Sequence, residues 1–398
     1  MKLMFSAINS VLDTSNGAAI SIRTFLRYLS RYGVECQSLT ASIYDKPGPG
    51  TPLENMQATG ALPVQEPGLP QTLWLKVDEG VRHNIEFGPA MTQGDFTDEA
   101  QQRLYNRALA ILDEFRPDVL LLYGNRRYEA SMLRQARLRG IKTVFYLVNP
   151  NYKERDRFEH VDMIFTDTEA TRDLFAERFG FDCKVVGKFI EPPAVPPSTR
   201  PPHFVTFINP APEKGVTLFL RIAELAAQIM PEARFLVVES RSLLSRAEQR
   251  TGINAAAFRN VKRVGLQRDM GAVFGATKVL LAPSLWHDSG PRVAVEALSF
   301  GIPSVVSNRG GLPELVGPAG IVIEPPAPLV ADHWLVPPLS DAIPWVEALR
   351  VLLTDQEVFD EYQRLAFEQF AKHDPALRLP KIVALLEELV ASKSEAAI

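Results

Sequence analysis

Residues 283–314 read PSLWHDSGPRVAVEALSFGIPSVVSNRGGLPE, which divides into the end of an apolar strand, a loop, a helix, a second strand and a glycine-rich loop. Pro291 suits the first position of the helix, because its missing N–H would be unpaired there, and Ser289 or Gly290 is the expected N-cap. Gly301 should end the helix. A strand, a helix and a second strand in succession predict a parallel α/β sheet. Both loops should then lie at one edge of that sheet, beside a helix N-terminus that favours an anion.

The same alternation of short apolar runs and amphipathic stretches continues on both sides of this segment. The apolar runs show no polar alternation, as expected of parallel strands that are buried on both faces. The expected strands are Leu3–Ile8, Val119–Tyr123, Thr143–Val148, Met163–Thr166, Phe204–Asn209, Phe235–Glu239, Val279–Pro283 and Ser304–Ser307. The expected helices include Ala19–Tyr32, Asp98–Phe115 and Leu218–Ile229. The pattern predicts two doubly wound α/β domains that face a cleft.

Proline-rich stretches mark the organisation of the chain. Residues 191–202 read EPPAVPPSTRPP, which predicts a semi-rigid linker between two halves, and residues 324–338 interrupt the second half. The segment from Asp45 to about Thr92 looks irregular and is too long for a plain connection, so we expect it to pack over the first sheet or to border a site. The predicted parts are residues 1–190, 203–372 and 373–398.

The composition is that of an ordinary globular protein, with 398 residues, 46% of them hydrophobic, and a formal net charge of −4, which does not indicate a nucleic-acid partner. Cys36 and Cys183 have no metal-ligand spacing. The start, MKLMFSAINS, resembles a first strand more than a signal peptide, and no apolar run approaches the ~18 residues of a transmembrane helix. We expect a cytoplasmic protein.

A group of arginines has two possible roles. They form a solvated helix face, or they contact an anion, which would be an acceptor or the inner face of a membrane. These arginines are at positions 126, 127, 134, 137 and 139.

The segment from Asp288 to Glu314 resembles the donor-site signature of retaining glycosyltransferases of GT-B fold, glycosyltransferase family 4 (glycosyl transferases group 1). That signature is an acid, seven residues, a glutamate, Gly-x-Pro, a strand and Gly-Gly-x-x-Glu. Here Asp288 and Glu296 are followed by GIP at 301–303 and by GGLPE at 310–314. Upstream, FVTFINPAPEKG at 204–215 resembles the strand and loop in which the family carries an arginine and then Lys-Gly.

The resemblance implies a GT-B fold with an acceptor domain at 1–190, a nucleotide-sugar domain at 203–372 and a helical segment, 373–398, that returns to the first domain. It implies a retaining hexosyl- or deoxyhexosyltransferase. The sugar would pass from a nucleoside-diphosphate sugar to a hydroxyl of a saccharide, a lipid-linked or a small-molecule acceptor. The implied mechanism is a front-face transfer without metal or cofactor, in which the leaving phosphate acts as the base.

The resemblance also assigns roles to residues. Lys214 would stabilise the leaving diphosphate, Asp288 would balance positive charge at the transferred sugar, and Glu296 would bind the ribose hydroxyls. The other expected donor-site residues are Asn209, Gly290, Pro291, Arg292, Gly310, Gly311, Glu239 and Gly265. The acceptor-side candidates are Gly17, Asn16, His83 and Asn125.

The sequence departs from the family pattern at three places, and these keep alternatives open. Asp288 replaces a glutamate, Gly290-Pro291 replaces Phe-Gly, and Asn209 replaces an arginine whose charge Arg292 or Arg309 could supply. A second hypothesis is therefore a catalytically weak nucleotide-sugar-binding protein on the same scaffold. A solute-binding protein is disfavoured by the acid and Lys-Gly signature, and a dehydrogenase by the lack of Gly-x-Gly-x-x-Gly after the first strand.

Competing structural roles exist for the same residues. Glu296 could merely form a helix pair with Arg292, Asp288 could be a loop or capping residue, and Lys214 could be a solvated lysine. His83 could be buried for structural reasons.

Overall fold

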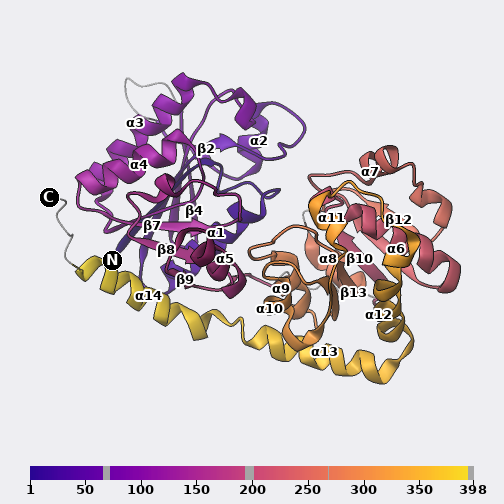
Figure 1. Ribbon diagram of the computed structural model, residues 1–398. Coiled ribbons are helices and arrows are strands. Elements are labelled where there is room, and N and C mark those ends of the chain that lie inside the picture. The colour runs from indigo at the N-terminus through magenta and orange to yellow at the C-terminus, as the bar shows by residue number, and fades with distance from the viewer. Residues whose placement is uncertain (66–71, 193–200, 268, 393–398) are drawn as a thin grey trace. The chain divides into compact units, whose positions relative to one another are not determined.

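The computed structural model describes residues 1–65, 72–192, 201–267 and 269–392, and Figure 1 shows its ribbon. The chain divides into two compact units. Unit 1 comprises Met1–Asp167, Thr171–Phe189 and Pro375–Ile398, and unit 2 comprises Thr168–Ala170 and Ile190–Asp374. Each unit is built on its own sheet. The predicted pair of Rossmann-like α/β domains is confirmed. Most of the proline-rich linker, residues 193–200, lies outside the described residues.

Unit 1 contains a sheet with the strand order β3-β4-β5-β2-β1-β6-β7-β8-β9. Its strands are β1 (Lys2–Asn9), β2 (Glu35–Ile43), β3 (Leu62–Pro63), β4 (Leu73–Asp78), β5 (Val81–Glu86), β6 (Val119–Leu122), β7 (Lys142–Leu147), β8 (Met163–Thr166) and β9 (Cys183–Val185). The helices that accompany it are α1 (Gly17–Arg31), α2 (Pro52–Ala58), α3 (Asp98–Phe115), α4 (Arg127–Leu138), α5 (Glu169–Phe179) and α14 (Pro375–Ala391).

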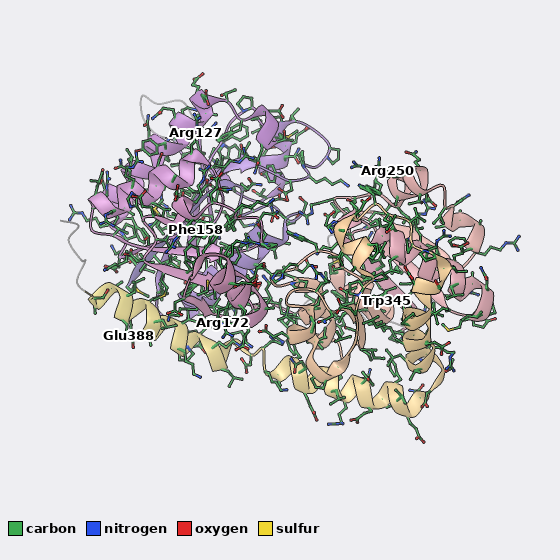
Figure 2. All side chains as sticks on the ribbon, viewed as in Figure 1. Arg127, Phe158, Arg172, Arg250, Trp345 and Glu388 are labelled. Carbon is green, nitrogen blue, oxygen red and sulfur yellow. The ribbon has the colours of Figure 1, made fainter. Side chains whose placement is uncertain are left out.

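The sheet of unit 1 is covered on both faces. Successive residues of β1 point to opposite faces, so that Phe5 joins one apolar cluster and Met4 the other. Phe158, labelled in Figure 2, lies in the second cluster. Burial on both faces explains why these strands appear as unbroken apolar runs. Helix α14 belongs to the same core, because Leu379 and Leu386 are buried in the first cluster.

The segment at 45–92 differs from its expected irregular form. It contains α2 and the hairpin of β4 and β5, in which β5 joins the sheet by parallel pairing with β2 and β4 adds to it by antiparallel pairing. Met56 of α2 is buried in the first apolar cluster, so part of the segment does pack over the sheet. Glu79 and Gly80 form the two-residue turn, with φ of 49° and 83°. Two consecutive positive φ values match the turn type that joins twisted strands. Only the expected irregular form was wrong, because Glu-Gly is not one of the dipeptides that mark such turns in a sequence.

Unit 2 contains a six-stranded sheet whose pairs are all parallel, with the order β12-β11-β10-β13-β14-β15. Its strands are β10 (Phe204–Ile208), β11 (Arg234–Val238), β12 (Val261–Val264), β13 (Thr277–Ala282), β14 (Ser304–Ser307) and β15 (Gly320–Ile323). Its helices are α6 (Val216–Ile229), α7 (Leu244–Thr251), α8 (Met270–Ala276), α9 (Arg292–Ser299), α10 (Leu312–Val316), α11 (Ala327–Ala331), α12 (Ile343–Thr354) and α13 (Gln356–Ala371). Trp345, labelled in Figure 2, is buried in the core beside the sheet. None of the described helices is long and apolar enough to span a membrane.

Candidate functional site

The strand order of unit 2 places a topological switch point between β10 and β13. Counted from β10, the order is 3-2-1-4-5-6, so the chain runs outward from β10 on one side and from β13 on the other. Ligands of open α/β sheets bind beyond the carboxyl ends of the strands at such a point. The loop after β10 carries Lys214, the loop after β13 carries Asp288, and the loop after β14 carries Gly310 and Gly311. The predicted donor residues therefore meet at the edge where a ligand is expected.

Backbone contacts join the loops that carry Lys214 and Asp288. The carbonyl oxygen of Glu213 accepts hydrogen bonds from the backbone N–H of Leu285, at 3.0 Å, and of Trp286, at 3.2 Å. Gly215 follows with φ of 79°, and a Cβ there would lie 1.9 Å from the carbonyl oxygen of Pro283. Only glycine fits this backbone without a shift. The Lys-Gly pair is thus explained by close packing of two neighbouring loops.

Lys214 and Asp288 form an ion pair. The Nζ of Lys214 lies 2.5 Å from Oδ1 of Asp288, and Ser284 Oγ donates to Oδ2 of the same carboxylate at 2.7 Å. The Asp288 side chain is 8% exposed and that of Lys214 is 21% exposed. The two residues are 74 positions apart in the sequence. Lys214 is therefore not a merely solvated lysine, and its charge is balanced in this state of the protein.

The glycine-rich loop after β14 packs against the backbone of Asp288. The N–H of Gly311 donates to the carbonyl oxygen of Asp288 at 2.7 Å. A Cβ on Gly310 would lie 2.4 Å from that oxygen. These glycines thus serve close packing of two loops, besides any contact with a ligand.

Glu296 lies on α9 and takes part in a helix pair. Arg292 Nη2 donates to its Oε1 at 2.8 Å, and no described residue donates to its Oε2. The residue is 8% exposed. Pro291 is the N-cap, so the helix begins one residue later than the sequence suggested, while Gly301 follows its end with φ of 66°. One carboxylate oxygen of Glu296 remains available to a ligand.

Three other donor-site candidates follow strands of the same sheet, and two of them have structural contacts. Asn209 has φ of 61°, and its Oδ1 accepts a hydrogen bond from the N–H of Ser242 at 3.2 Å. Glu239 Oε1 accepts from the N–H of Leu244 at the start of α7, at 2.8 Å. Gly265 follows β12 and is exposed, with open space around its Cβ position. Asn209 and Glu239 therefore hold loops at the carboxyl edge of the sheet.

The acceptor-side candidates of unit 1 separate into two groups. Asn16 caps α1 through hydrogen bonds from the N–H groups of residues 18 and 19, and Gly17 begins that helix. Asn125 is exposed in the loop after β6, the neighbour of β1, so these three residues share one edge of the sheet. His83 lies within β5 with no exposed surface, and its Nδ1 is 2.7 Å from Ser38 Oγ. Burial lowers the pKa of His83 to about 3, which keeps the ring neutral.

The sequence analysis missed polar groups at that same edge. Asp45 follows β2, and its carboxylate accepts from the side-chain amides of Asn9, at 3.0 Å, and Asn16, at 2.8 Å. Glu129 caps the first turn of α4, and burial raises its pKa to about 7. Local signals could have indicated both residues. Asp45 lies just after the end of strand β2, which the sequence analysis did not recognise. Glu129 lies three residues after the N-cap, Arg126, which is the position of a capping glutamate.

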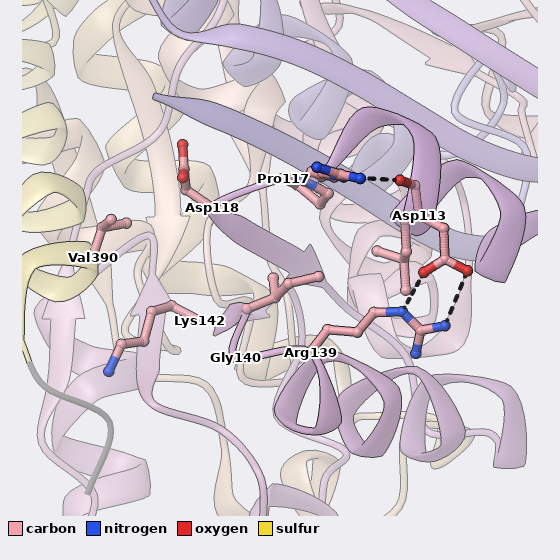
Figure 3. Close-up of a pocket in the computed structure, with 10 residues that line it drawn as sticks. Asp113, Pro117, Asp118, Arg139, Gly140, Lys142 and Val390 are labelled. Atoms are coloured by element: carbon pink, nitrogen blue, oxygen red, sulfur yellow. Dashed lines mark hydrogen bonds and ion pairs between the residues drawn. The ribbon is translucent and has the colours of Figure 1, made fainter.

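A surface hollow of about 630 Å³ lies elsewhere in unit 1 (Figure 3). It is lined by residues near the amino ends of β6 and β7, among them Asp118 and Lys142. Arg139 at its rim donates to Asp113 Oδ1 at 2.8 Å. This end of the sheet is opposite to the carboxyl edge, so the hollow is separate from both groups of candidates.

On α4, Arg127, Arg134 and Arg137 are exposed, and a membrane contact through them stays a prediction.

Comparisons with known proteins agree with the sequence motifs. Residues 202–355 match the family model of the glycosyl transferases group 1. No curated protein matches the chain. Sucrose-phosphate synthase from Thermosynechococcus elongatus has a similar structure, with a TM-score of 0.68 and 13% identity over 98% of this chain and 99% of that one. HepE from Anabaena, in complex with UDP and glucose, has a TM-score of 0.66 and 14% identity over 97% and 99%. Trehalose 6-phosphate synthase from Burkholderia multivorans has a TM-score of 0.62 and 13% identity over 99% and 100%. The resemblance to this family and the GT-B fold are confirmed.

Proposed function

We propose that this protein transfers a sugar from a nucleoside-diphosphate sugar to an acceptor hydroxyl, with retention of the anomeric configuration. The observation that carries the proposal is the pairing of Lys214 with Asp288 at the switch point of unit 2. The family match over the same domain supports glycosyl transfer. HepE holds UDP and glucose, and another structure of it holds UDP-glucose, so UDP-sugars are the first donors to test.

The proposed chemistry assigns a separate task to each side chain. As the bond from the anomeric carbon to the diphosphate breaks, negative charge grows on the phosphate oxygen and positive charge on the sugar. Lys214 stabilises the first of these, and the carboxylate of Asp288 the second. The acceptor hydroxyl attacks from the face of the leaving group and gives its proton to the departing phosphate. Glu296 accepts hydrogen bonds from the ribose through its available oxygen.

A donor screen tests the function. A ligand that binds only the folded state stabilises it by about 2.7 kcal/mol at a hundred times its Kd, which gives a clear rise in Tm. We expect one nucleoside diphosphate and its hexose or deoxyhexose conjugates to raise the Tm, and sugar release from that conjugate to increase with a suitable acceptor. Absence of stabilisation by every nucleoside diphosphate and every conjugate tested would contradict the proposal.

A second candidate is a nucleotide-sugar-binding protein with weak catalysis. The observation that favours it is the ion pair itself, because Asp288 already occupies one of the three N–H donors of Lys214 and balances its charge. Tight binding of the donor without transfer to any acceptor or to water would support this candidate over the enzyme.

Turnover should survive removal of divalent metal ions. Lys214 can meet the charge of the leaving diphosphate without a metal, so chelation with EDTA should leave the rate nearly unchanged. The measurement is the rate of donor consumption with EDTA and after addition of Mg²⁺ or Mn²⁺. A rate that disappears in EDTA and returns with either ion contradicts the metal-independent mechanism.

Replacing Glu296 by alanine should weaken nucleotide binding. A hydrogen bond to a charged group contributes about 1.5–3 kcal/mol, so the Kd should rise roughly ten- to hundredfold. Calorimetric titration with the nucleoside diphosphate measures it. Glu347→Ala is the matched control, because Glu347 pairs with Arg350 on the exposed face of α12. If Glu296→Ala binds the nucleotide as tightly as the parent and the control do, the role of Glu296 is limited to its ion pair with Arg292.

A further inference from the structure

The donor site contains cations whose charges are already balanced. Lys214 pairs with Asp288, and Arg292 pairs with Glu296. A diphosphate that enters this edge is an anion and needs cationic donors that are available to it. Asn209 supplies no charge, and its amide oxygen holds a neighbouring loop. A further cation near the switch point would provide the positive charge that the diphosphate needs.

Arg309 has the contacts that such a cation should have. Its Nε is buried, and within the described part of the chain it meets no hydrogen-bond partner. No described residue forms an ion pair with its guanidinium either. The residue as a whole is partly exposed, so a ligand can reach its guanidinium, and the buried Nε is a donor that such a ligand could meet. The exposed arginines of α12 and α13 differ, since Arg350 and Arg364 pair with glutamates on their own helices.

The position of Arg309 in the fold agrees with this role. It lies in the loop after β14, next to the strand that carries the Asp288 loop. The residue that follows it, Gly310, packs on the backbone of Asp288, and Gly311 donates to that backbone. Arg309 is therefore one residue from a direct contact with the loop that holds the Lys214 partner.

We propose that Arg309 binds the diphosphate of the donor and supplies the charge that Asn209 lacks. The guanidinium offers a planar set of N–H donors that matches phosphate oxygens, and it keeps its charge when buried. This inference rests on the proposed function, because it requires a nucleoside-diphosphate donor in unit 2. It assigns to Arg309 the binding of phosphate, separate from the recognition of base and ribose.

The test separates phosphate from nucleoside. Binding of UDP and of uridine, and of GDP and guanosine, is measured by calorimetry for the parent, Arg309→Gln and Arg309→Lys. We expect Arg309→Gln to raise the Kd of the preferred diphosphate about tenfold or more, with the Kd of the nucleoside nearly unchanged. Arg309→Lys should restore part of the difference. Arg350→Gln is the matched control, since it removes an equal charge from an exposed position of the same unit.

Each outcome decides the inference. If Arg309→Gln binds the diphosphate as tightly as the parent, the inference is wrong while the proposed function stands. An equal loss for diphosphate and nucleoside shows that Arg309 supports the loop and also overturns it, as does an equal loss in Arg350→Gln. If the parent itself binds none of the four ligands, the inference falls together with the proposed nucleotide site.

Discussion

Replacing Lys214 by alanine should lower kcat by about a hundredfold or more, because its ammonium group stabilises charge that appears only as the donor bond breaks. Removal of one preorganised donor to a developing anion typically costs about 10²–10³ in kcat. A loss of this size in kcat, larger than the change in KM, is the sign of an interaction made in the transition state. Transfer measured at saturating donor checks the prediction, and a kcat near that of the parent would contradict it.

The ion pair complicates that experiment in a way that a second variant resolves. Lys214→Ala leaves the buried carboxylate of Asp288 with Ser284 as its remaining side-chain donor, and an unpaired buried charge destabilises a fold. The double variant Lys214→Ala/Asp288→Asn restores the charge balance, so it should regain Tm while remaining inactive. Lys262→Ala, on the exposed side of β12, is the control for loss of a lysine. Recovery of activity together with Tm in the double variant would show that Lys214 serves stability.

Local signals explain what the sequence could predict. Strands β8 and β14 and helix α3 have the predicted bounds, because buried parallel strands are short apolar runs and the helix begins after a capping threonine. The segment 283–314, which follows β13, likewise marked α9 and β14 through a proline at the helix start and a glycine at its end. The sequence also predicted the edge at which Lys214 and Asp288 meet, because loops that follow parallel strands lie at the carboxyl edge of the sheet.

The rest of the site depends on tertiary contacts that no local pattern contains. The pairing of Lys214 with Asp288 joins residues 74 positions apart, and its distance is set by packing of Gly215 against residue 283. The burial of Arg309 Nε is likewise a feature of the folded chain that sequence spacing does not show. In unit 1, His83 is buried because β5 pairs with β2, and neither strand was predicted. A titratable residue in an unrecognised strand cannot be distinguished from one in a loop by sequence alone.

The ion pair also changes what a substitution of Asp288 should do to nucleotide binding. In the parent, the carboxylate competes with the donor's phosphates for Lys214, because both anions bind the same Nζ. Asp288→Asn removes the competing charge and keeps the shape, and the amide can still meet Ser284. The affinity for the free nucleoside diphosphate should therefore stay equal or rise. A rise would slow product release, since the diphosphate must leave the same lysine.

Asp288→Asn should at the same time lower kcat at least tenfold, a loss of about 1.4 kcal/mol or more of transition-state stabilisation. A carboxylate near the anomeric carbon helps only while positive charge develops there, so the amide cannot replace it. Single-turnover transfer separates this chemical step from product release, and in the steady state kcat should fall while KM should not rise. Asp288→Glu restores the charge and should keep measurable activity. If Asp288→Asn transfers the sugar as fast as the parent in a single turnover, the carboxylate only positions Lys214, and the group that balances the sugar's charge must lie on another loop of the carboxyl edge.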